Sequence, residues 1–394
     1  MTVKTIVAGV GMIPFSKPGR SEPYTSMGRE AAKIALKDAG VDYDKIQEAF
    51  VGYVYGDSTA GQTVLYQVGL TGIPVVNVNN NCSTGSTALY LARRAIETGM
   101  ADCVLALGFE QMEPGALGVM FPDRPTPFDS FTNRMKEIQG WDDKAPFAAQ
   151  FFGGAGLKHQ ELYGTKDETF ARISVKARRH AANNPLAIFR DPITLEDVMA
   201  SKPIFGPLTR LQCCPPTCGA AAAVLCSEEF AKKHGLDTTV YIAAQSMTTD
   251  TSSSFDASDM RKLVGYDMAK AAADQVYEKA AISPKDIPVV ELHDCFSANE
   301  LISYEALGLC EEGSAEKFIM DNQNTYGGQC VVNPSGGLLS KGHPLGATGL
   351  AQCTELVNQL RDNADKRQVE GARFALQHNL GLGGACVVTL YAKQ

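Results

Sequence analysis

The chain has 394 residues, 44% of them hydrophobic and 20% charged, and a formal net charge of -8. These values are ordinary for a globular protein with room for two or more domains, and the negative charge argues against general binding to nucleic acid or anionic membranes. The sequence has eleven cysteines without disulfide-framework spacing and no apolar stretch long enough to span a bilayer. We therefore expect a protein of a reducing compartment with no membrane span.

The first informative elements predict a sharp turn that carries a cysteine. β-Branched residues predict a strand over 73–78, and apolar residues at helical spacing predict a helix over 86–98. Cys82 lies between them, where backbone N–H groups and the positive end of the helix are expected to lower the pKa of its thiol. Cysteine is more often a small buried hydrophobe than a nucleophile, so this motif alone leaves both interpretations open.

The middle of the chain, residues 112–250, is organised differently. It combines a proline-rich run at 121–127 with an aromatic and glycine stretch at 151–156 and several helix-like segments.

Two groups of side chains in this region need interpretation. The first group is basic and consists of Lys176, Arg178 and Arg179. It predicts either a solvated helix face or a surface that meets phosphates. The second group consists of Cys213, Cys214 and Cys218, which lack a second pair of metal ligands. We interpret these cysteines as buried packing.

Two histidine motifs follow in the second half. His293 and Cys295 lie at the end of the apolar run 287–290, so they are either catalytic or satisfied groups at a buried strand end. His343 precedes a predicted helix over 346–360, with a proline in its first turn, where proline is favoured. Taken alone, this Gly-His-Pro sequence indicates only a turn histidine that caps a helix.

An internal repeat gives His343 more weight. Residues 30–46 and 271–287 share a pattern of helix, polar turn and strand. In a second register Cys82 aligns with His343, and a glycine three residues further on aligns in both halves. A pseudo-twofold axis between such halves would bring the two motif helices together and give Cys82 and His343 equivalent places.

Together the motifs resemble the thiolase family, in particular the sterol carrier protein 2-type thiolases, over essentially the whole chain. The segments that carry the resemblance are Asn80–Ser86, His293–Phe296, Gly342–Gly349 and His378–Gly384. Most thiolases have Asn-Glu-Ala-Phe at the second segment and Cys-x-Gly where this chain has Asn379-Leu380-Gly381; both departures are typical of the sterol carrier type. Cys295 is then the only motif cysteine left to act as a second catalytic thiol.

The resemblance implies an α/β thiolase fold, in which two similar βαβ-rich halves form a five-layer αβαβα sandwich with an inserted loop domain. We expect the first part of the N-terminal half at 1–111, an inserted domain that covers the active site at 112–250, and the C-terminal half at 251–394. The resemblance also implies a homodimer that takes acyl-CoA and CoA as substrates, with no metal, nucleotide or prosthetic group.

It further implies a role for each motif residue. His343 takes the proton from Cys82, whose thiolate attacks the 3-keto carbon of a 3-oxoacyl-CoA. Backbone N–H groups of Cys82 and Gly381 hold the resulting oxyanion, while His293 and His343 hold the thioester oxygen of the departing enolate. Cys295 donates the proton to carbon.

Three neighbouring polar residues have weaker interpretations. Asn379 is either structural or helps to orient a water molecule. Asp294 either points away from the site or supports a neighbouring group. No role is assigned to His378.

The predicted reaction is thiolysis of 3-oxoacyl-CoA, including 2-methyl-branched and sterol side-chain substrates, to a shortened acyl-CoA plus acetyl-CoA or propionyl-CoA. One alternative is a ketoacyl synthase-like condensing enzyme, which has no need of the second thiol at Cys295. The other is a lipid- or acyl-CoA-binding protein without turnover, against which the intact Cys82 and His343 argue. The resemblance implies a peroxisomal location, although residues 391–394 are not an import signal of the Ser-Lys-Leu type, and otherwise a cytoplasmic one.

Overall fold

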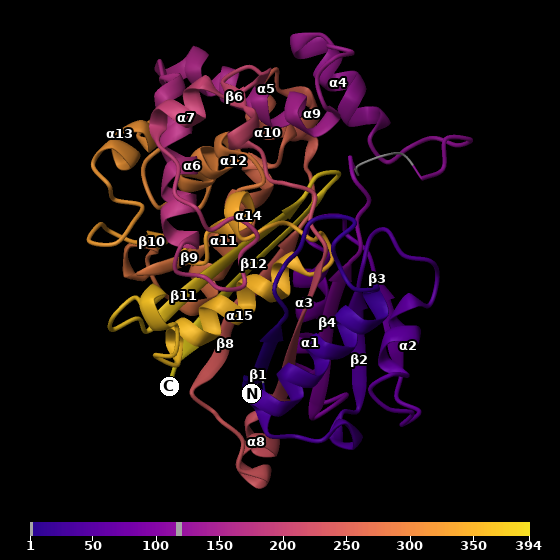
Figure 1. Ribbon diagram of the computed structural model, residues 1–394. Coiled ribbons are helices and arrows are strands. Elements are labelled where there is room, and N and C mark those ends of the chain that lie inside the picture. The colour runs from indigo at the N-terminus through magenta and orange to yellow at the C-terminus, as the bar shows by residue number, and fades with distance from the viewer. Residues whose placement is uncertain (1–2, 116–119) are drawn as a thin grey trace.

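The computed structural model describes residues 3–115 and 120–394, and a mixed sheet runs through its centre (Figure 1). Five strands come from the first part of the chain: β1 (Thr5–Met12), β2 (Glu48–Gly52), β3 (Val75–Val78), β4 (Cys103–Glu110) and β7 (Gly219–Ser227). Five come from the second part: β8 (Val240–Thr248), β9 (Val289–Glu291), β10 (Val331–Val332), β11 (Phe374–Gly381) and β12 (Ala385–Lys393). Their order is β10-β9-β11-β12-β8-β1-β7-β4-β2-β3, so each set forms one half of the sheet.

The two halves of the sheet have the same topology. In each half the second strand pairs in parallel with the third and the fourth, and the fifth strand pairs antiparallel with the fourth and the first. The residue pair Ile6–Tyr241 joins β1 to β8 between the halves. This shared order of strands confirms the predicted repeat.

Helices cover both outer faces of the sheet and fill the space between its halves (Figure 1). On the outer side of the first half lie α1 (Tyr24–Ala39) and α2 (Ala60–Leu65), and on that of the second half α11 (Tyr266–Ala280) and α12 (Ser297–Ala306). Between the halves, α3 (Thr84–Glu97) and α15 (Thr348–Leu360) share one buried apolar cluster with strands of both. This succession of layers confirms the predicted αβαβα sandwich. None of the helices in the described residues is both long and apolar enough to cross a membrane.

A long excursion leaves the sheet between β4 and β7 and lies at the top of Figure 1. It contains α4 (Asp129–Gln139), α5 (Phe147–Tyr163), α6 (Asp167–Ala181), α7 (Leu195–Ala200) and a small sheet of β5 (Pro203–Phe205) and β6 (Leu208–Thr209). The predicted inserted domain, 112–250, is longer than this excursion, because it also includes β7 and β8, which lie in the central sheet. The alanine run of β7 is buried throughout but lacks the β-branched residues that mark a strand in a sequence.

Several short helices connect these elements. They are α8 (Glu228–His234), α9 (Ser252–Asp256), α10 (Met260–Leu263), α13 (Ala315–Met320) and α14 (Gly337–Ser340). The last of them lies directly before the Gly-His-Pro turn.

The beginnings of α3 and α15 lie in contact through glycines. A Cβ atom on Gly85 would lie 2.7 Å from the carbonyl oxygen of Gly346. A Cβ atom on Gly346 would lie 2.7 Å from the carbonyl oxygen of Gly52 and still closer to that of Phe109. Because the absence of side chains permits this approach, the Cys82 turn and the His343 turn can face each other.

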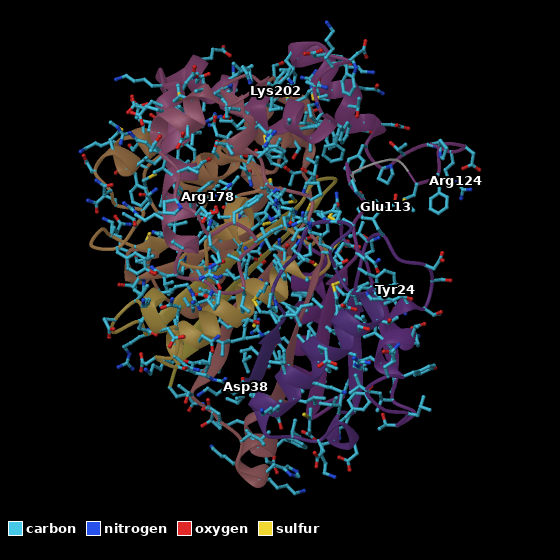
Figure 2. The ribbon with its side chains drawn as sticks, in the orientation of Figure 1. Tyr24, Asp38, Glu113, Arg124, Arg178 and Lys202 are labelled. Carbon is cyan, nitrogen blue, oxygen red and sulfur yellow. The ribbon has the colours of Figure 1, made fainter. Side chains whose placement is uncertain are left out.

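An ion pair holds the far end of α15 to the first half. Arg361, which follows α15, donates from Nη1 to the carboxylate of Asp38 at 2.7 Å and from Nη2 to the carbonyl oxygen of Ala8 at 2.8 Å. Asp38, labelled in Figure 2, also accepts the backbone N–H of Val10 at 2.8 Å. The helix that follows the second motif is thus fixed at both ends to the half that carries the first.

We predict that Gly346→Ala destabilises the protein by about 3 kcal/mol, because the new methyl group overlaps two backbone carbonyl oxygens that side-chain rearrangement cannot move. The control is Gly99→Ala, where a Cβ atom meets open space and a φ of 70° costs only about 1 kcal/mol. Urea unfolding followed by circular dichroism measures both. Equal effects of the two substitutions would contradict the close packing.

Candidate active site

Cys82 lies at the tip of a tight turn between β3 and α3. Asn81 has a φ of 50°, in the left-handed region that asparagine tolerates better than most residues. The hydroxyls of Ser83 and Thr84 donate to the carbonyl oxygens of residues 80 and 81, which fixes the turn. The half-buried Cys82 side chain therefore projects from the start of the helix toward the second half.

Two histidines from the second half meet this cysteine. The sulfur of Cys82 and a ring nitrogen each of His293 and His343 lie within 4.8 Å of one another. The two imidazole rings are 5.1 Å apart between centroids and nearly perpendicular, at 82°. The structure thus brings together three of the four residues predicted to be catalytic.

Buried polar contacts hold the His343 turn. The preceding Lys341 forms an ion pair of 3.2 Å with Glu291 at the end of β9, and the backbone N–H of His343 donates to the hydroxyl of Thr217 at 3.1 Å. Nδ1 of His343 lies 2.7 Å from the hydroxyl oxygen of Thr348. Its Nε2 atom is buried and has no hydrogen-bond partner among the described residues.

The thiol and the imidazole are both electrically neutral at rest. Burial raises the pKa of Cys82 to about 12, and the nearby Glu110 adds to the rise. Backbone N–H groups of Cys82 and Leu382 point at the sulfur and act in the opposite sense, but they do not compensate. The expected lowering of the pKa of Cys82 is therefore wrong: loss of hydration outweighs the helix end. Burial also lowers the pKa of His343 to about 3.

Asn379 connects the cysteine turn to His293. Its side-chain amide donates to Nδ1 of His293 at 3.0 Å and to the carbonyl oxygen of Cys82 at 3.1 Å. Burial, with the neighbouring His343 and His378, lowers the pKa of His293 well below its usual value. Asn379 is thus in direct contact with two of the predicted catalytic residues.

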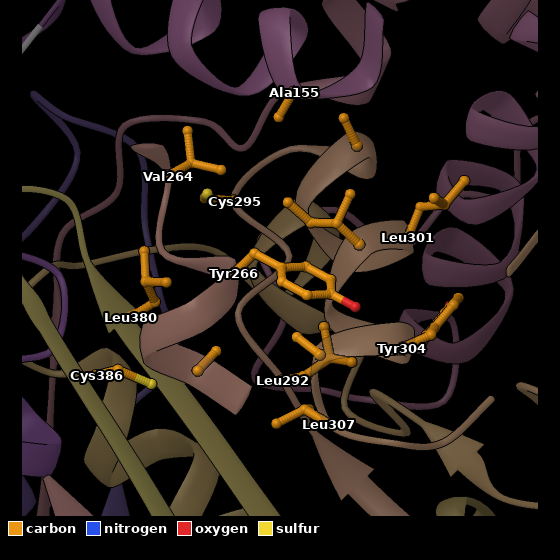
Figure 3. Packing of buried hydrophobic residues seen from close by; sticks show 14 of the residues in the cluster. Ala155, Val264, Tyr266, Leu292, Cys295, Leu301, Tyr304, Leu307, Leu380 and Cys386 are labelled. Carbon is orange, nitrogen blue, oxygen red and sulfur yellow. The ribbon is translucent and has the colours of Figure 1, made fainter. Parts of the chain in front are cut away.

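Cys295 has apolar surroundings. It is 4% exposed, and Figure 3 shows it among Ala155, Val264 and Tyr266 in the apolar cluster of the second half. Burial raises the pKa of its thiol well above the usual range, and neighbouring Cys214 and Cys82 add to the effect. Cys295 therefore remains a protonated thiol.

Comparisons with known proteins agree with the resemblance to thiolases. Residues 5–193 match the family model for the thiolase N-terminal domain, and residues 249–391 match the thiolase C-terminal domain-like model. The chain belongs to the thiolase family. It is 57% identical to sterol carrier protein 2 of Oryctolagus cuniculus, over 98% of this chain and 72% of the rabbit protein. The family assignment makes it an acyltransferase.

Solved structures share the fold. An Ltp2-ChsH2(DUF35) aldolase matches with a TM-score of 0.83 and 25% identity, over 98% of this chain and 97% of that one. Human mitochondrial 3-ketoacyl-CoA thiolase in complex with CoA matches with a TM-score of 0.74 and 19% identity, over 100% and 98% of the two chains. Both confirm the predicted thiolase fold.

The sequence did not reveal that the segment 213–216 contacts the motifs of His293 and His343. Bridges pair Cys213 with Phe296 and Pro216 with His343, and the backbone N–H of Cys214 donates to the carbonyl oxygen of Cys295 at 2.9 Å. The interpretation as buried packing holds for Cys218, whereas Cys213 and Cys214 pack against the apolar cluster but are only half-buried. The two prolines that follow them, which cannot donate a backbone hydrogen bond, were the available signal of a loop.

Glu110 was also missed. This buried carboxylate at the end of β4 accepts the backbone N–H groups of Val54 at 3.1 Å, Tyr55 at 2.9 Å and Gly346 at 3.0 Å. Burial raises its pKa to about 7. It holds the His343 turn from the first half, whereas Asn379 holds the Cys82 turn from the second.

Gly381 is packed tightly against the cysteine turn. A Cβ atom there would lie 2.9 Å from the hydroxyl oxygen of Ser83 and closer still to the carbonyl oxygen of Asn80. The backbone N–H from this segment that faces the sulfur belongs to Leu382, the next residue. The role of Gly381 as an oxyanion donor stays a prediction.

The predicted basic group does not form one surface. Lys176 is 4% exposed and is paired with Glu300, so it neither lies on a solvated face nor reaches a phosphate. Arg178, labelled in Figure 2, stacks on Phe189 at 4.3 Å. Arg179 donates to the hydroxyl of Thr325 at 3.0 Å.

Two residues with weak interpretations have clear structural contacts. Asp294 points away from the site. Its carboxylate accepts the backbone N–H groups of Leu338 and Leu339 at 2.7 and 3.3 Å. His378 belongs to β11, and its Nδ1 atom accepts the backbone N–H of His293 at 3.4 Å.

We predict that the buried histidines destabilise this thiolase at acid pH. Burial lowers the pKa of His378 to about 3, so below about pH 6.5 the unfolded chain binds a proton that the folded protein excludes. Stability is then lost as pH falls, by up to about 1.4 kcal/mol per pH unit for this group. Glu110, with a raised pKa, acts in the opposite sense, so a difference between variants is the proper measure.

Accordingly, His378→Gln flattens the dependence of the free energy of unfolding on pH between 7 and 5. Denaturant unfolding at several pH values measures the slope. The matched control is His234→Gln, an exposed histidine whose replacement leaves the slope as it was. An unchanged slope in His378→Gln would show that this histidine is not excluded from protonation.

Proposed function

We propose that this thiolase cleaves 3-oxoacyl-CoA with CoA through an acyl intermediate on Cys82. The observation that carries the proposal is the meeting, within 4.8 Å, of the Cys82 sulfur with ring nitrogens of His293 and His343. A half-buried thiol close to an imidazole nitrogen that has no hydrogen-bond partner among the described residues is the arrangement needed to make a nucleophile at the moment of attack. The CoA complex of the human mitochondrial enzyme supports CoA as the second substrate.

In the first step His343 accepts the thiol proton as the sulfur attacks the 3-keto carbon. Because the thiol has a pKa of about 12, a preformed thiolate is not the resting state, and proton transfer accompanies attack. The alkoxide accepts hydrogen bonds from the backbone N–H groups of Cys82 and Gly381. Each donor contributes about two to three orders of magnitude in rate.

In the second step the bond between C2 and C3 breaks. Its electron pair forms the enolate of the departing CoA thioester, and the acyl group stays on Cys82. The enolate oxygen accepts N–H groups of His293 and His343, and Cys295 donates its proton to carbon. CoA then attacks the acyl-cysteine, and its thiol proton restores Cys295. The sulfur of Cys82 is expelled and takes back the proton held by His343, and the shortened acyl-CoA leaves.

The resemblance to sterol carrier protein 2 supports a preference for 2-methyl-branched and sterol side-chain substrates, which release propionyl-CoA when branched. The homodimer is part of the same proposal. The strand β3 lies at one end of the central sheet, and Val76 on it is 40% exposed, which suits pairing with a second copy. A peroxisomal location rests on the family resemblance alone.

We expect the purified protein to cleave both a linear and a 2-methyl-branched 3-oxoacyl-CoA when CoA is added, and Cys82→Ala to abolish both reactions. Loss of thioester absorbance and product chromatography measure the cleavage. Failure of the folded protein to cleave either substrate would overturn the proposal. Cleavage without CoA would instead indicate chemistry of the aldolase type known for the Ltp2 structure.

We predict that Cys295→Ala still permits transfer of an acyl group from a simple thioester to Cys82 but blocks carbon–carbon cleavage. The acyl-enzyme is measured by mass spectrometry and cleavage by product formation. Cys330→Ala is the matched control, because Cys330 is another buried cysteine of the same apolar cluster outside the site, and we expect it to keep both reactions. Equal loss of both reactions in Cys295→Ala would contradict a role confined to the carbanion.

A further inference from the structure

A chain of hydrogen bonds leads to His293 from Tyr391, which lies on β12 in the apolar cluster between the two halves. The hydroxyl of Tyr391 donates to Oε1 of Gln377, whose Nε2 donates to the hydroxyl oxygen of Ser86 at 2.8 Å. Ser86 in turn donates to Oδ1 of Asn379 at 2.8 Å, and Nδ2 of Asn379 lies 3.0 Å from Nδ1 of His293. All five side chains are at most 1% exposed, so solvent does not compete for these bonds.

Two backbone carbonyl groups fix the direction of the chain. A carbonyl oxygen only accepts, so the atom of Asn379 that faces the carbonyl of Cys82 at 3.1 Å must be the amide nitrogen. The same holds for Gln377, whose amide nitrogen faces the carbonyl of Gly349 at 2.7 Å. The orientation of both amides therefore follows from their surroundings.

This direction decides which nitrogen of His293 carries its proton. An amide N–H can only donate, so Nδ1 of His293 must offer its lone pair. A neutral imidazole then has its proton on Nε2. The ring is a hydrogen-bond donor at that atom.

His343 is held in the opposite tautomer. The hydroxyl of Thr348 donates to the carbonyl oxygen of Pro344 at 2.9 Å, so its oxygen accepts the Nδ1–H of His343. The lone pair of His343 is then on Nε2, which has no partner among the described residues. The two adjacent histidines are thus chemically different: one donates and the other acts as a base.

We propose that Asn379 is a positioning residue that holds His293 in the Nε2–H tautomer. The inference rests on the proposed function in one respect, namely that this N–H stabilises the enolate oxygen. A second consequence does not depend on the reaction. Cys82, His293 and His343 have the spacing of a soft-metal site, but with a proton on Nε2 of His293 only two of the three can bind a metal ion.

Asn379→Asp is the decisive variant. The new carboxylate can still accept from Ser86, but its second oxygen only accepts, so it draws the ring proton of His293 to Nδ1. Nε2 of His293 then carries a lone pair. We expect kcat for carbon–carbon cleavage to fall by about two to three orders of magnitude with little change in KM, because a donor to the transition state is lost.

The same variant should acquire metal affinity. We expect Co²⁺ to bind Asn379→Asp at least about tenfold more tightly than the wild type, with the absorption of a thiolate-to-cobalt bond. Cys82→Ala combined with Asn379→Asp is the control that removes this absorption. A merely structural defect would lower activity without creating a metal site.

The tautomer itself can be observed without substrate. Nitrogen-15 NMR of the six histidines, with His293→Gln to assign the signal, is expected to show Nε2 protonated in the wild type and Nδ1 protonated in Asn379→Asp. Asn379→Ala, which removes the amide that contacts Nδ1 of His293, is expected to give a mixture of the two tautomers. Wild-type protein with Nδ1 protonated, or a variant with both nitrogens protonated and unchanged Co²⁺ affinity, would overturn the inference. Absence of thiolysis in the wild type would instead count against the proposed function alone.

Discussion

The close contact between the starts of α3 and α15 is the constraint on which the site depends. Each helix begins at a motif turn, and the sulfur of one turn can meet the imidazole of the other only if the two backbones approach without side chains between them. Gly85 and Gly346 provide this approach directly, since a Cβ atom on either would overlap backbone of the other half. The two halves of the central sheet, the helix layers and the ion pair of Arg361 hold this contact in place.

Burial at this contact determines the chemistry. It keeps the thiols protonated and the imidazoles neutral, so the site stores no ion pair and moves protons only during the reaction. Because neither histidine is charged, the two rings differ only in which nitrogen carries the proton, and the direction of their hydrogen bonds determines this. Thr348 and Asn379, which contact Nδ1 of their respective histidines, supply that direction.

Much of this organisation could be predicted because it is written in local sequence. The motif turns and the helices after them follow from residue type and spacing, and the repeat was visible in two registers: α1 and α11 end at Ala39 and Ala280, each followed by a polar turn and a strand. What could not be predicted depends on partners distant in sequence. The pKa of Cys82 depends on burial by other segments, Lys176 is buried because Glu300 pairs with it, and the alanines of β7 form a strand because sheet neighbours flank them.

The two halves carry different polar side chains at equivalent places of the repeat. The fourth strand of each half ends beside the motif turn of the other half: β4 ends at Glu110, which binds the backbone of Gly346, and β11 carries Asn379, which binds the backbone of Cys82. A carboxylate only accepts, and it meets backbone N–H groups alone. An amide both donates and accepts, and this allows Asn379 to bind a carbonyl oxygen and a ring nitrogen at once. The amide at this position is therefore what distinguishes the donor histidine from the basic one, and a carboxylate in the same place would make the two alike.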